Sequence, residues 1–132
     1  MIYFLDTCIC VHILNGNTKC MDKVEEKGID SVFLPSVVVA ELFYGAYKSA
    51  KREQNLRKIR GFVHLFKIEG FNNDAVEVYG EIRAILERKG NAIGANDFFI
   101  SAIAKAHNAI LVTNNTRKFS RIPGLTIEDW IE

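Results

Sequence analysis

The sequence lacks the features that mark membrane, secreted and disulfide-stabilised proteins. No apolar run approaches the ~20 residues that a membrane-spanning helix needs, and an acid at position 6 interrupts the apolar N-terminal stretch, so we expect no signal peptide. The three cysteines, at positions 8, 10 and 20, give an odd count without the paired spacing of a zinc site. These absences predict reduced thiols in a soluble, cytoplasmic protein.

A strong charge of one sign is also missing. The formal net charge is +1, so any preference for nucleic acid or an anionic membrane must come from local patches. Repeats, linkers and low-complexity tracts are absent as well. What is present is an ordinary globular composition, with 48% hydrophobic and 25% charged residues. A chain of 132 residues with this composition predicts a single domain over residues 1–132.

Short apolar runs alternate with longer segments of helical periodicity along the chain. The runs, which we predict to be strands, lie at residues 1–5, 32–35, 65–68, 109–112 and 125–127. The predicted helices span residues 7–14, 18–27, 37–49, 52–64, 72–89 and 96–108. Thr18 and Ser36 are the expected N-caps of two of them, and residues 128–132 are expected to form a tail. Such alternation predicts an α/β layer fold around a mostly parallel sheet.

Three acids and one amide are placed unusually for residues that only confer solubility. Asp6 ends the first apolar run, Asp97 opens the most hydrophobic helix, and Asn115 follows the strand at 109–112. Ligands of α/β sheets gather at such strand ends. Glu41 shares a helical face with Val37, Val38, Tyr44, Gly45 and Lys48, where a carboxylate needs a cation or a strong hydrogen-bond partner. Oxygen ligands of this type predict a site for Mg²⁺ or Mn²⁺, which most often handles phosphate.

Each of these residues also has a purely structural interpretation. Asp6 and Asp97 could cap the helices that begin next to them, and Asn115 is by default a turn residue. Glu41 is less easily explained in this way, because a structural partner such as Lys48 lies two turns away along the helix. Only the joint placement of the four residues favours a metal site.

The segment from residue 48 to residue 60 is rich in basic residues. Its cations are Lys48, Lys51, Arg52, Arg57, Lys58 and Arg60, against the lone acid Glu53. Such a run is usually a solvated helix face, but the lack of balancing acids equally fits binding to phosphates.

Four blocks of the sequence, in order and at similar separations, resemble PIN-domain ribonucleases. They are Leu5-Asp6-Thr7, residues 38–45 (VVAELFYG), residues 94–97 (GAND) and residues 111–119 (LVTNNTRKF). The likeness is greatest to the VapC toxins of bacterial toxin–antitoxin pairs, and it extends to Glu128-Asp129-Trp130. The resemblance implies a three-layer α/β/α sandwich with a mostly parallel central sheet, whose acids bind Mg²⁺, or Mn²⁺ in its place, and hydrolyse RNA phosphodiesters.

The resemblance also implies roles for the acids. Asp6 and Asp97 would be metal ligands, and Glu41 would be a further ligand or hold the nucleophilic water. Thr7 and Thr113 would support the site. On this pattern the three acids are the catalytic residues of a metal-dependent nuclease.

Two positions depart from the family pattern. Cys8 stands where Asn commonly follows the Asp-Thr pair, which would alter the hydrogen bonds around Asp6. Asn115 falls where many relatives carry a fourth acid, and an amide coordinates a metal more weakly than a carboxylate. We include Asn115 among the catalytic candidates, and because both departures leave the three acids in place we expect activity.

Similar toxins also have characteristic partners. They are usually homodimers, they are inhibited by a small VapB-like antitoxin, and they meet DNA only through that antitoxin. Many cut tRNA, and the anticodon stem-loop of initiator tRNA is the leading candidate substrate. The expected RNA phosphate contacts are Lys48, Lys51, Arg52, Arg83, Arg88, Lys89 and Arg117. A rival hypothesis is a catalytically silent PIN-like binding module that acts on DNA through its antitoxin complex.

Overall fold

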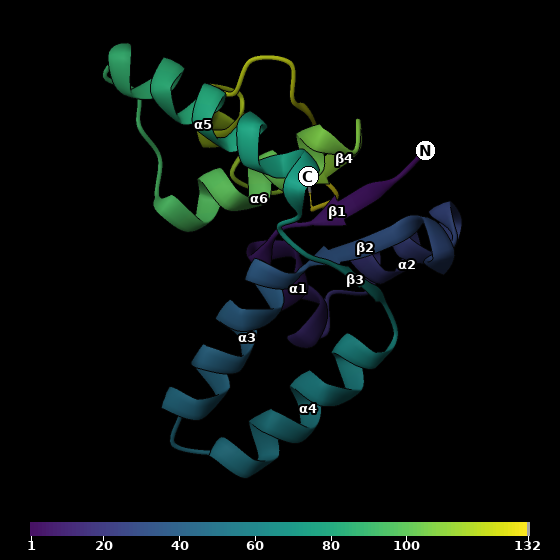
Figure 1. The fold of residues 1–132 in the computed structure, drawn as a ribbon. Coiled ribbons are helices and arrows are strands. Elements are labelled where there is room, and N and C mark those ends of the chain that lie inside the picture. The colour runs from purple at the N-terminus through teal and green to yellow at the C-terminus, as the bar shows by residue number, and fades with distance from the viewer. Residues whose placement is uncertain (132) are drawn as a thin grey trace.

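Five short strands form the centre of the protein, which is described over residues 1–131 by a computed structural model (Figure 1). The strands are β1 (Tyr3–Leu5), β2 (Val32–Pro35), β3 (Lys67–Glu69), β4 (Ile110–Val112) and β5 (Thr126–Glu128). They pair in the order β3-β2-β1-β4-β5, and every pairing is parallel. The prediction of a mostly parallel sheet is confirmed.

The central strand β1 is the point at which the strand order reverses. Tyr3 is paired with Val32 of β2 on one side and with Ile110 of β4 on the other. From β1 the chain builds outward through β2 to β3, and then crosses back to add β4 and β5 on the opposite side. Open α/β sheets bind ligands in the crevice at such a reversal, outside the carboxyl ends of the strands. In this chain, Asp6 follows the carboxyl end of β1 and Thr113 follows the carboxyl end of β4.

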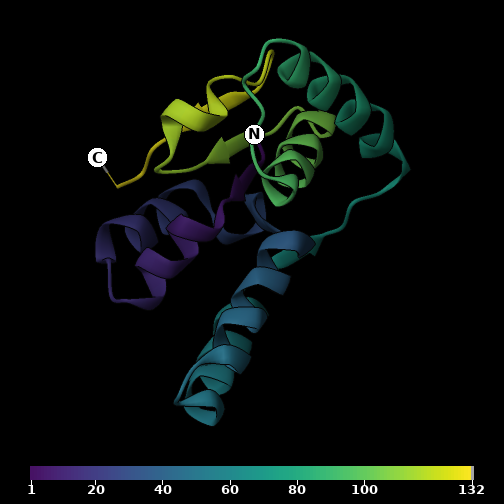
Figure 2. The same ribbon diagram turned by 90° about the vertical axis from the view of Figure 1, so that its left-hand side faces the viewer.

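Helices cover both faces of the sheet. The helices are α1 (Thr7–Leu14), α2 (Thr18–Lys27), α3 (Ser36–Lys48), α4 (Arg52–His64), α5 (Asn73–Arg88), α6 (Ala95–Ala106) and the short α7 (Thr116–Phe119), with a 3₁₀ turn at Ile29–Ser31. α5 and α6 lie on one side of the sheet, and α1 and α2 lie on the other (Figures 1 and 2). This arrangement confirms the predicted three-layer α/β/α sandwich. All six predicted helices are present, with ends within two residues of those expected.

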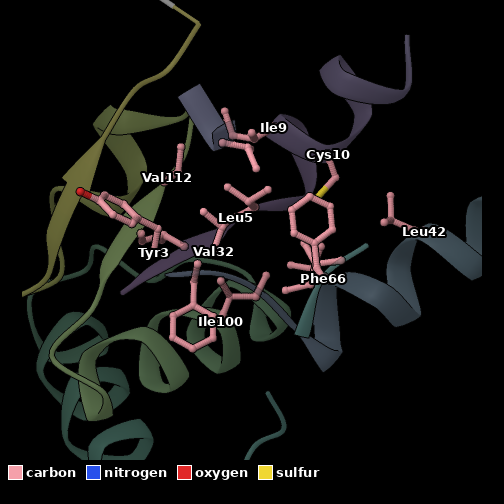
Figure 3. Packing of buried hydrophobic residues seen from close by; sticks show 14 of the residues in the cluster. Tyr3, Leu5, Ile9, Cys10, Val32, Leu42, Phe66, Ile100 and Val112 are labelled. Atoms are coloured by element: carbon pink, nitrogen blue, oxygen red, sulfur yellow. The ribbon is translucent and has the colours of Figure 1, made fainter. Parts of the chain in front are cut away.

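The hydrophobic core fixes the strand that leads to Asp6. Figure 3 shows Leu5 of β1 and Val32 of β2 between Ile9 of α1 and Ile100 of α6. All four side chains have a relative exposure of 0%. Full burial of an aliphatic side chain of this size stabilises the fold by about 1.5–3 kcal/mol, so packing from both layers holds the end of β1 in place.

α3 and α4 form a helical hairpin that extends away from the sheet (Figure 2). Its buried residues are Val38, Leu42 and Ala46 on α3, and Leu56, Ile59 and Phe62 on α4. Of the residues that share a helical face with Glu41, Val38 is buried, whereas Tyr44, Gly45 and Lys48 are exposed. Apolar residues occur on two faces of α3, and the hairpin buries the face with Leu42 and Ala46.

Two predicted N-caps are wrong, because Thr18 and Ser36 are each the first residue of their helix and not its cap. Asn17 precedes α2, and its side-chain oxygen accepts a hydrogen bond from the backbone N–H of Cys20 at 3.2 Å. Asn is a stronger N-cap than Thr18, which becomes the first helical residue. α3 begins at Ser36, with Pro35 in the capping position at φ −62°. The backbone of Pro35 is extended, with ψ 140°, and the helical conformation starts at Ser36.

The predicted C-terminal tail is wrong for residues 128–131. Glu128 is the last residue of β5, and its carbonyl accepts a hydrogen bond from the backbone N–H of Thr113 at 2.9 Å. Trp130 is 2% exposed and packs on Tyr3, with ring centroids 5.5 Å apart. Burial of this indole on the central strand outweighs the entropy lost when the segment is ordered. Glu132, the last residue of the expected tail, lies outside the described residues.

Two further features bear on the class of protein. None of the helices within residues 1–131 has both the length and the apolar character that crossing a bilayer requires. Cys8, Cys10 and Cys20 are free thiols, and the last two have no exposed surface.

Candidate active site

Asp6 lies where β1 passes directly into α1. Its backbone N–H donates to the carbonyl of Val112 at 2.9 Å, which ties it to β4. One carboxylate oxygen, Oδ1, accepts a hydrogen bond from the backbone N–H of Thr7 at 2.8 Å, so the side chain caps α1. The structural interpretation of Asp6 as an N-cap is therefore confirmed, but it accounts for only one of the two carboxylate oxygens.

The second oxygen of Asp6, Oδ2, faces the end of β4. The hydroxyl of Thr113 donates to it at 2.8 Å. That hydroxyl oxygen also accepts a hydrogen bond from the backbone N–H of Asn115 at 3.0 Å, which leaves its proton for Asp6. Thr113 has a relative exposure of 0%, so the surrounding core fixes the direction of this hydrogen bond.

Asp6 is buried without a cationic partner. It is 6% exposed, and none of the ion pairs within residues 1–131 includes it. Burial raises the pKa of Asp6 above its ordinary value; the hydrogen bonds from Thr113 and Thr7 oppose the rise, and the charge of Asp97 adds to it. A carboxylate in such surroundings is stabilised by a cation bound against it.

Asp97 brings a second carboxylate to this corner from the first turn of α6. Gly94, and not Asp97, occupies the capping position of that helix, so the interpretation of Asp97 as a simple cap is wrong. Its Oδ2 instead forms an ion pair with Nζ of Lys118, at 2.7 Å. Sequence reasoning did not single out Lys118, which lies on α7, 21 residues further along the chain. The one signal for it was its place in the 111–119 block.

Glu41 is joined to the same corner through Thr7. The Thr7 hydroxyl donates to Oε1 of Glu41 at 2.7 Å, while the Thr7 backbone N–H holds Asp6. Within the described chain no hydrogen bond uses Oε2 of Glu41, which is half-buried. Lys48, the structural partner considered for Glu41, has its ammonium 5.5 Å from the centre of the Tyr44 ring. The pairing of Glu41 with Lys48 is therefore wrong.

Clefts open on both sides of the acids. Asp97 and Asn115 line a cleft of about 400 Å³, and its basic lining residues are Arg117, Lys118 and Arg121. Thr7 and Glu41 line a second cleft of about 700 Å³, which also contains Tyr44, Phe71, Asn96 and Phe99. The side chain of Asn115 is exposed, and only its backbone is bonded to Thr113. The structure thus places Asn115 beside Asp97, and Glu41 in the neighbouring cleft.

Cys8 contributes to the hydrogen bonds around Asp6, as its position after the Asp-Thr pair suggested. Its thiol donates to Oδ2 of Asp6 at 3.5 Å, and its sulfur accepts from the backbone N–H of Asn114 at 3.4 Å. Burial raises the pKa of the Cys8 thiol. The residue is therefore a neutral donor to the carboxylate at neutral pH.

The donor set of this corner suits a hard divalent cation. Asp6, Asp97 and Glu41 offer only oxygen atoms, which Mg²⁺ and Mn²⁺ prefer, and the buried charge of Asp6 favours a positive ligand. Among the residues at 1–131, no group of three His, Cys, Asp or Glu side chains is placed to hold a metal ion. In this conformation Lys118 supplies positive charge to Asp97. The metal and catalytic roles of the acids remain predictions.

The seven predicted phosphate contacts lie in three separate places. Arg117 lines the cleft that contains Asp97. The others are Lys48, Lys51 and Arg52 around the α3–α4 turn, and Arg83, Arg88 and Lys89 on or just after α5. Arg83 is already bonded to Glu87, at 3.0 Å, and to the Tyr79 hydroxyl. Of the seven, only Arg117 lines a cleft with one of the acids, and contact of any of them with RNA remains a prediction.

Known proteins resemble this chain over its full length. The pattern of the PIN domain family matches residues 3–125. Ribonuclease VapC2 of Rickettsia felis is 42% identical, with 98% of each chain covered. The tRNA(fMet)-specific endonuclease VapC of Salmonella typhimurium is 34% identical, with 97% of each chain covered. A crystal structure of VapBC2 from Rickettsia felis bound to a promoter DNA fragment contains a chain with a TM-score of 0.91 and 44% identity, covering 98% of this chain and 99% of that one.

Proposed function

This chain belongs to the PIN-domain family, and from that premise we propose that it is a metal-dependent endoribonuclease, the toxin of a VapBC-type toxin–antitoxin pair. One observation carries the proposal: Asp6 is buried at the strand-order reversal, has no ion pair within the described part of the chain, and is held by hydrogen bonds from Thr7 and Thr113. A carboxylate held in this way destabilises the fold unless it binds something positive. Such arrangements are typical of functional sites.

Asp6 and Asp97 are the residues that would hold Mg²⁺. When bound, a divalent ion supplies the positive charge that activates water and stabilises the attacked phosphate. Thr7 and Thr113 fix the directions of both Asp6 oxygens in advance, so the Asp6 carboxylate would not need to reorient when the metal binds. Glu41 has Oε1 held by Thr7 and keeps Oε2 to accept the proton of the attacking water.

We propose a tRNA as the substrate, with the anticodon stem-loop of initiator tRNA as the first candidate. The relative from Salmonella typhimurium, at 34% identity, is named a tRNA(fMet)-specific endonuclease. Proteins recognise RNA loops through splayed bases that stack on aromatic side chains. The cleft beside Glu41 offers such faces, from Tyr44, Phe71 and Phe99.

The proposed partners follow from the relatives. A VapB-like antitoxin would bind this chain and suppress its activity in the cytoplasm, and two copies of the chain would form a homodimer. DNA would be reached only through the antitoxin, as the family resemblance implies; the similar VapBC2 of Rickettsia felis has been solved bound to a promoter DNA fragment.

A silent binding module is the alternative, and one observation favours it. Lys118 neutralises Asp97 in this structure, so the acids do not form a ready metal site. A silent module would show no Mn²⁺ binding that depends on Asp6 and Asp97. Calorimetric titration of the wild type and of Asp97→Asn separates the two functions.

The test of the nuclease is cleavage of a defined RNA. Purified, antitoxin-free protein is incubated with initiator tRNA and, separately, with an elongator tRNA, in Mg²⁺ or in EDTA. We expect cleavage of the initiator tRNA that needs Mg²⁺ and is lost in Asp6→Asn and Asp97→Asn. Asp22→Asn is the matched control, because Asp22 is an exposed acid on α2. Cleavage at the wild-type rate by Asp6→Asn or Asp97→Asn would refute the proposal.

A further inference from the structure

The ion pair between Lys118 and Asp97 has no role in the mechanism described so far. Nζ of Lys118 lies 2.7 Å from Oδ2 of Asp97, and the two side chains are only 29% and 23% exposed. The ammonium also lies 5.1 Å from the centre of the Phe119 ring. An ion pair so largely withdrawn from solvent is stronger than the average surface pair. When no other cation is present, the ion pair therefore keeps the Asp97 carboxylate bonded to Lys118.

The pair neutralises only one of the three carboxylates at this corner. Asp6 is joined through the Thr113 hydroxyl to the backbone of Asn115, which lines the same cleft as Asp97. Among residues 1–131, the only ion pair of Lys118 is with Asp97, and Asp6 receives hydrogen bonds but no cation. A divalent cation could neutralise both carboxylates at once, so it has an electrostatic advantage over the single ammonium.

We propose that Lys118 is a resident counter-ion of the metal site: it leaves Asp97 when the divalent ion binds and then contacts an RNA phosphate. The inference rests on the proposed function, because it takes the acids as metal ligands and RNA as the substrate. It makes Lys118 a positioning and substrate-binding residue that the family resemblance did not assign in this chain.

The residues around Lys118 support its proposed contact with an RNA phosphate after it leaves Asp97. Asp97 is the only acid among the residues that line the 400 Å³ cleft, beside Arg117, Lys118 and Arg121. Once a metal ion binds Asp97, the remaining charged side chains that line the cleft are all basic. Basic side chains grouped in this way bind the phosphates of nucleic acids. An RNA phosphate bound in the same cleft would therefore be within reach of the displaced Lys118 ammonium.

The exchange couples metal binding to RNA binding. A phosphate that attracts Lys118 removes the competitor from Asp97 and so raises metal affinity, and by linkage the metal raises RNA affinity by the same factor. Full assembly of the metal site is then favoured when substrate is present.

The first experiment measures Mn²⁺ affinity without RNA, by calorimetric titration of the full-length protein. In Lys118→Gln the competitor is gone, and we expect Mn²⁺ to bind about three- to tenfold more tightly than in the wild type, as loss of a partly buried ion pair allows. Lys118→Arg keeps the charge and should bind Mn²⁺ like the wild type. Arg121→Gln is the matched control, because it removes one positive charge from the same cleft but no ion pair to Asp97.

The outcomes separate this inference from the proposed function. If the wild type and Lys118→Gln bind Mn²⁺ equally, the counter-ion role is refuted while the nuclease stands. If Arg121→Gln tightens binding as much as Lys118→Gln does, the effect is general electrostatics and the inference is again refuted. If neither the wild type nor Lys118→Gln binds Mn²⁺, both the inference and the metal role of the acids fail. Thermal unfolding in EDTA verifies that each variant is folded.

The second experiment measures RNA binding in a Glu41→Gln background, which keeps Asp6 and Asp97 but is expected to be inactive. The probe is a labelled anticodon stem-loop of initiator tRNA, titrated with protein in Mn²⁺ and in EDTA. We expect Lys118→Gln to weaken RNA binding by about threefold or more in Mn²⁺, the effect of one lost phosphate contact, and to have little effect in EDTA. Equal weakening in both conditions would show that Lys118 does not exchange partners.

Discussion

Replacement of Asp6 by Asn should stabilise the metal-free protein while it abolishes activity. Asp6 is 6% exposed, and its charge has no cationic partner within the described chain. Removing that charge relieves a desolvation penalty of several kcal/mol. Asn has one carbonyl oxygen, so it keeps a neutral hydrogen bond from Thr7, while the hydrogen bonds that Thr113 and Cys8 donate to the other carboxylate oxygen must be reversed or lost. Together these changes forfeit about 2 kcal/mol. We therefore expect Asp6→Asn to gain about 1 kcal/mol in free energy of unfolding.

The sign of the pH dependence follows from the same structure. The folded state raises the pKa of Asp6, so the stabilising contribution of Asp6 is fully present below its ordinary pKa. That contribution is lost as the pH rises through the higher pKa of the folded state. The advantage of Asp6→Asn should accordingly be present at pH 7–8 and vanish in acid, where the wild-type carboxyl is protonated.

Thermal and urea unfolding in EDTA provide the assay. A gain of about 1 kcal/mol corresponds to a rise in Tm of roughly 3–5 °C for a domain of this size. Asp22→Asn, an exposed acid on α2, should change Tm little. Added Mg²⁺ should stabilise the wild type but not Asp6→Asn. A metal-free Asp6→Asn that is less stable than the wild type at pH 7.5 would refute the reasoning, because Asp6 would then be a structural residue.

Three other substitutions test further parts of the structure. Thr113→Val removes the hydrogen bond to the buried Asp6 carboxylate and should lower the free energy of unfolding by about 1–3 kcal/mol, measured by urea unfolding, and slow cleavage. Glu41→Gln can still accept the hydrogen bond from Thr7, so folding and Mn²⁺ binding should persist while the cleavage rate falls at least about a hundredfold. Trp130→Ala should lower the free energy of unfolding by about 3–5 kcal/mol in thermal or urea unfolding, because the indole is 2% exposed. A loss under about 1 kcal/mol would show that the segment behaves as an unpacked tail.

Much of the fold could be predicted because its signals are local. The apolar run that ends at Asp6, and the runs at 32–35 and 109–112, are bounded by caps and turns that sequence periodicity detects. The strand order β3-β2-β1-β4-β5 could not be read in this way, because it depends on which buried strands pair across the chain. The meeting of Asp6 with Thr113 follows from that pairing and not from spacing.

The errors have physical causes of the same kind. α3 carries apolar residues on two faces, and only its packing in the hairpin with α4 shows that Leu42 and Ala46 are buried. Trp130 lies in a segment that the sequence predicts to be a tail, and only the pairing of β5 with β4 places its ring against Tyr3. Lys118 is one basic residue among several in the sequence, and its pairing with Asp97 requires the geometry of α6 and α7. Long-range packing decided each of these positions.

The most direct test of the nuclease is incubation of antitoxin-free protein with total RNA from a bacterium, followed by sequencing of the new RNA ends. The reactions contain Mg²⁺ or EDTA, and Asp97→Asn is run beside the wild type. We predict discrete fragments with ends in a tRNA anticodon loop, formed only by the wild type and only with Mg²⁺. Intact RNA from a folded wild-type protein that binds Mn²⁺, or the same fragments from Asp97→Asn, would contradict the assignment.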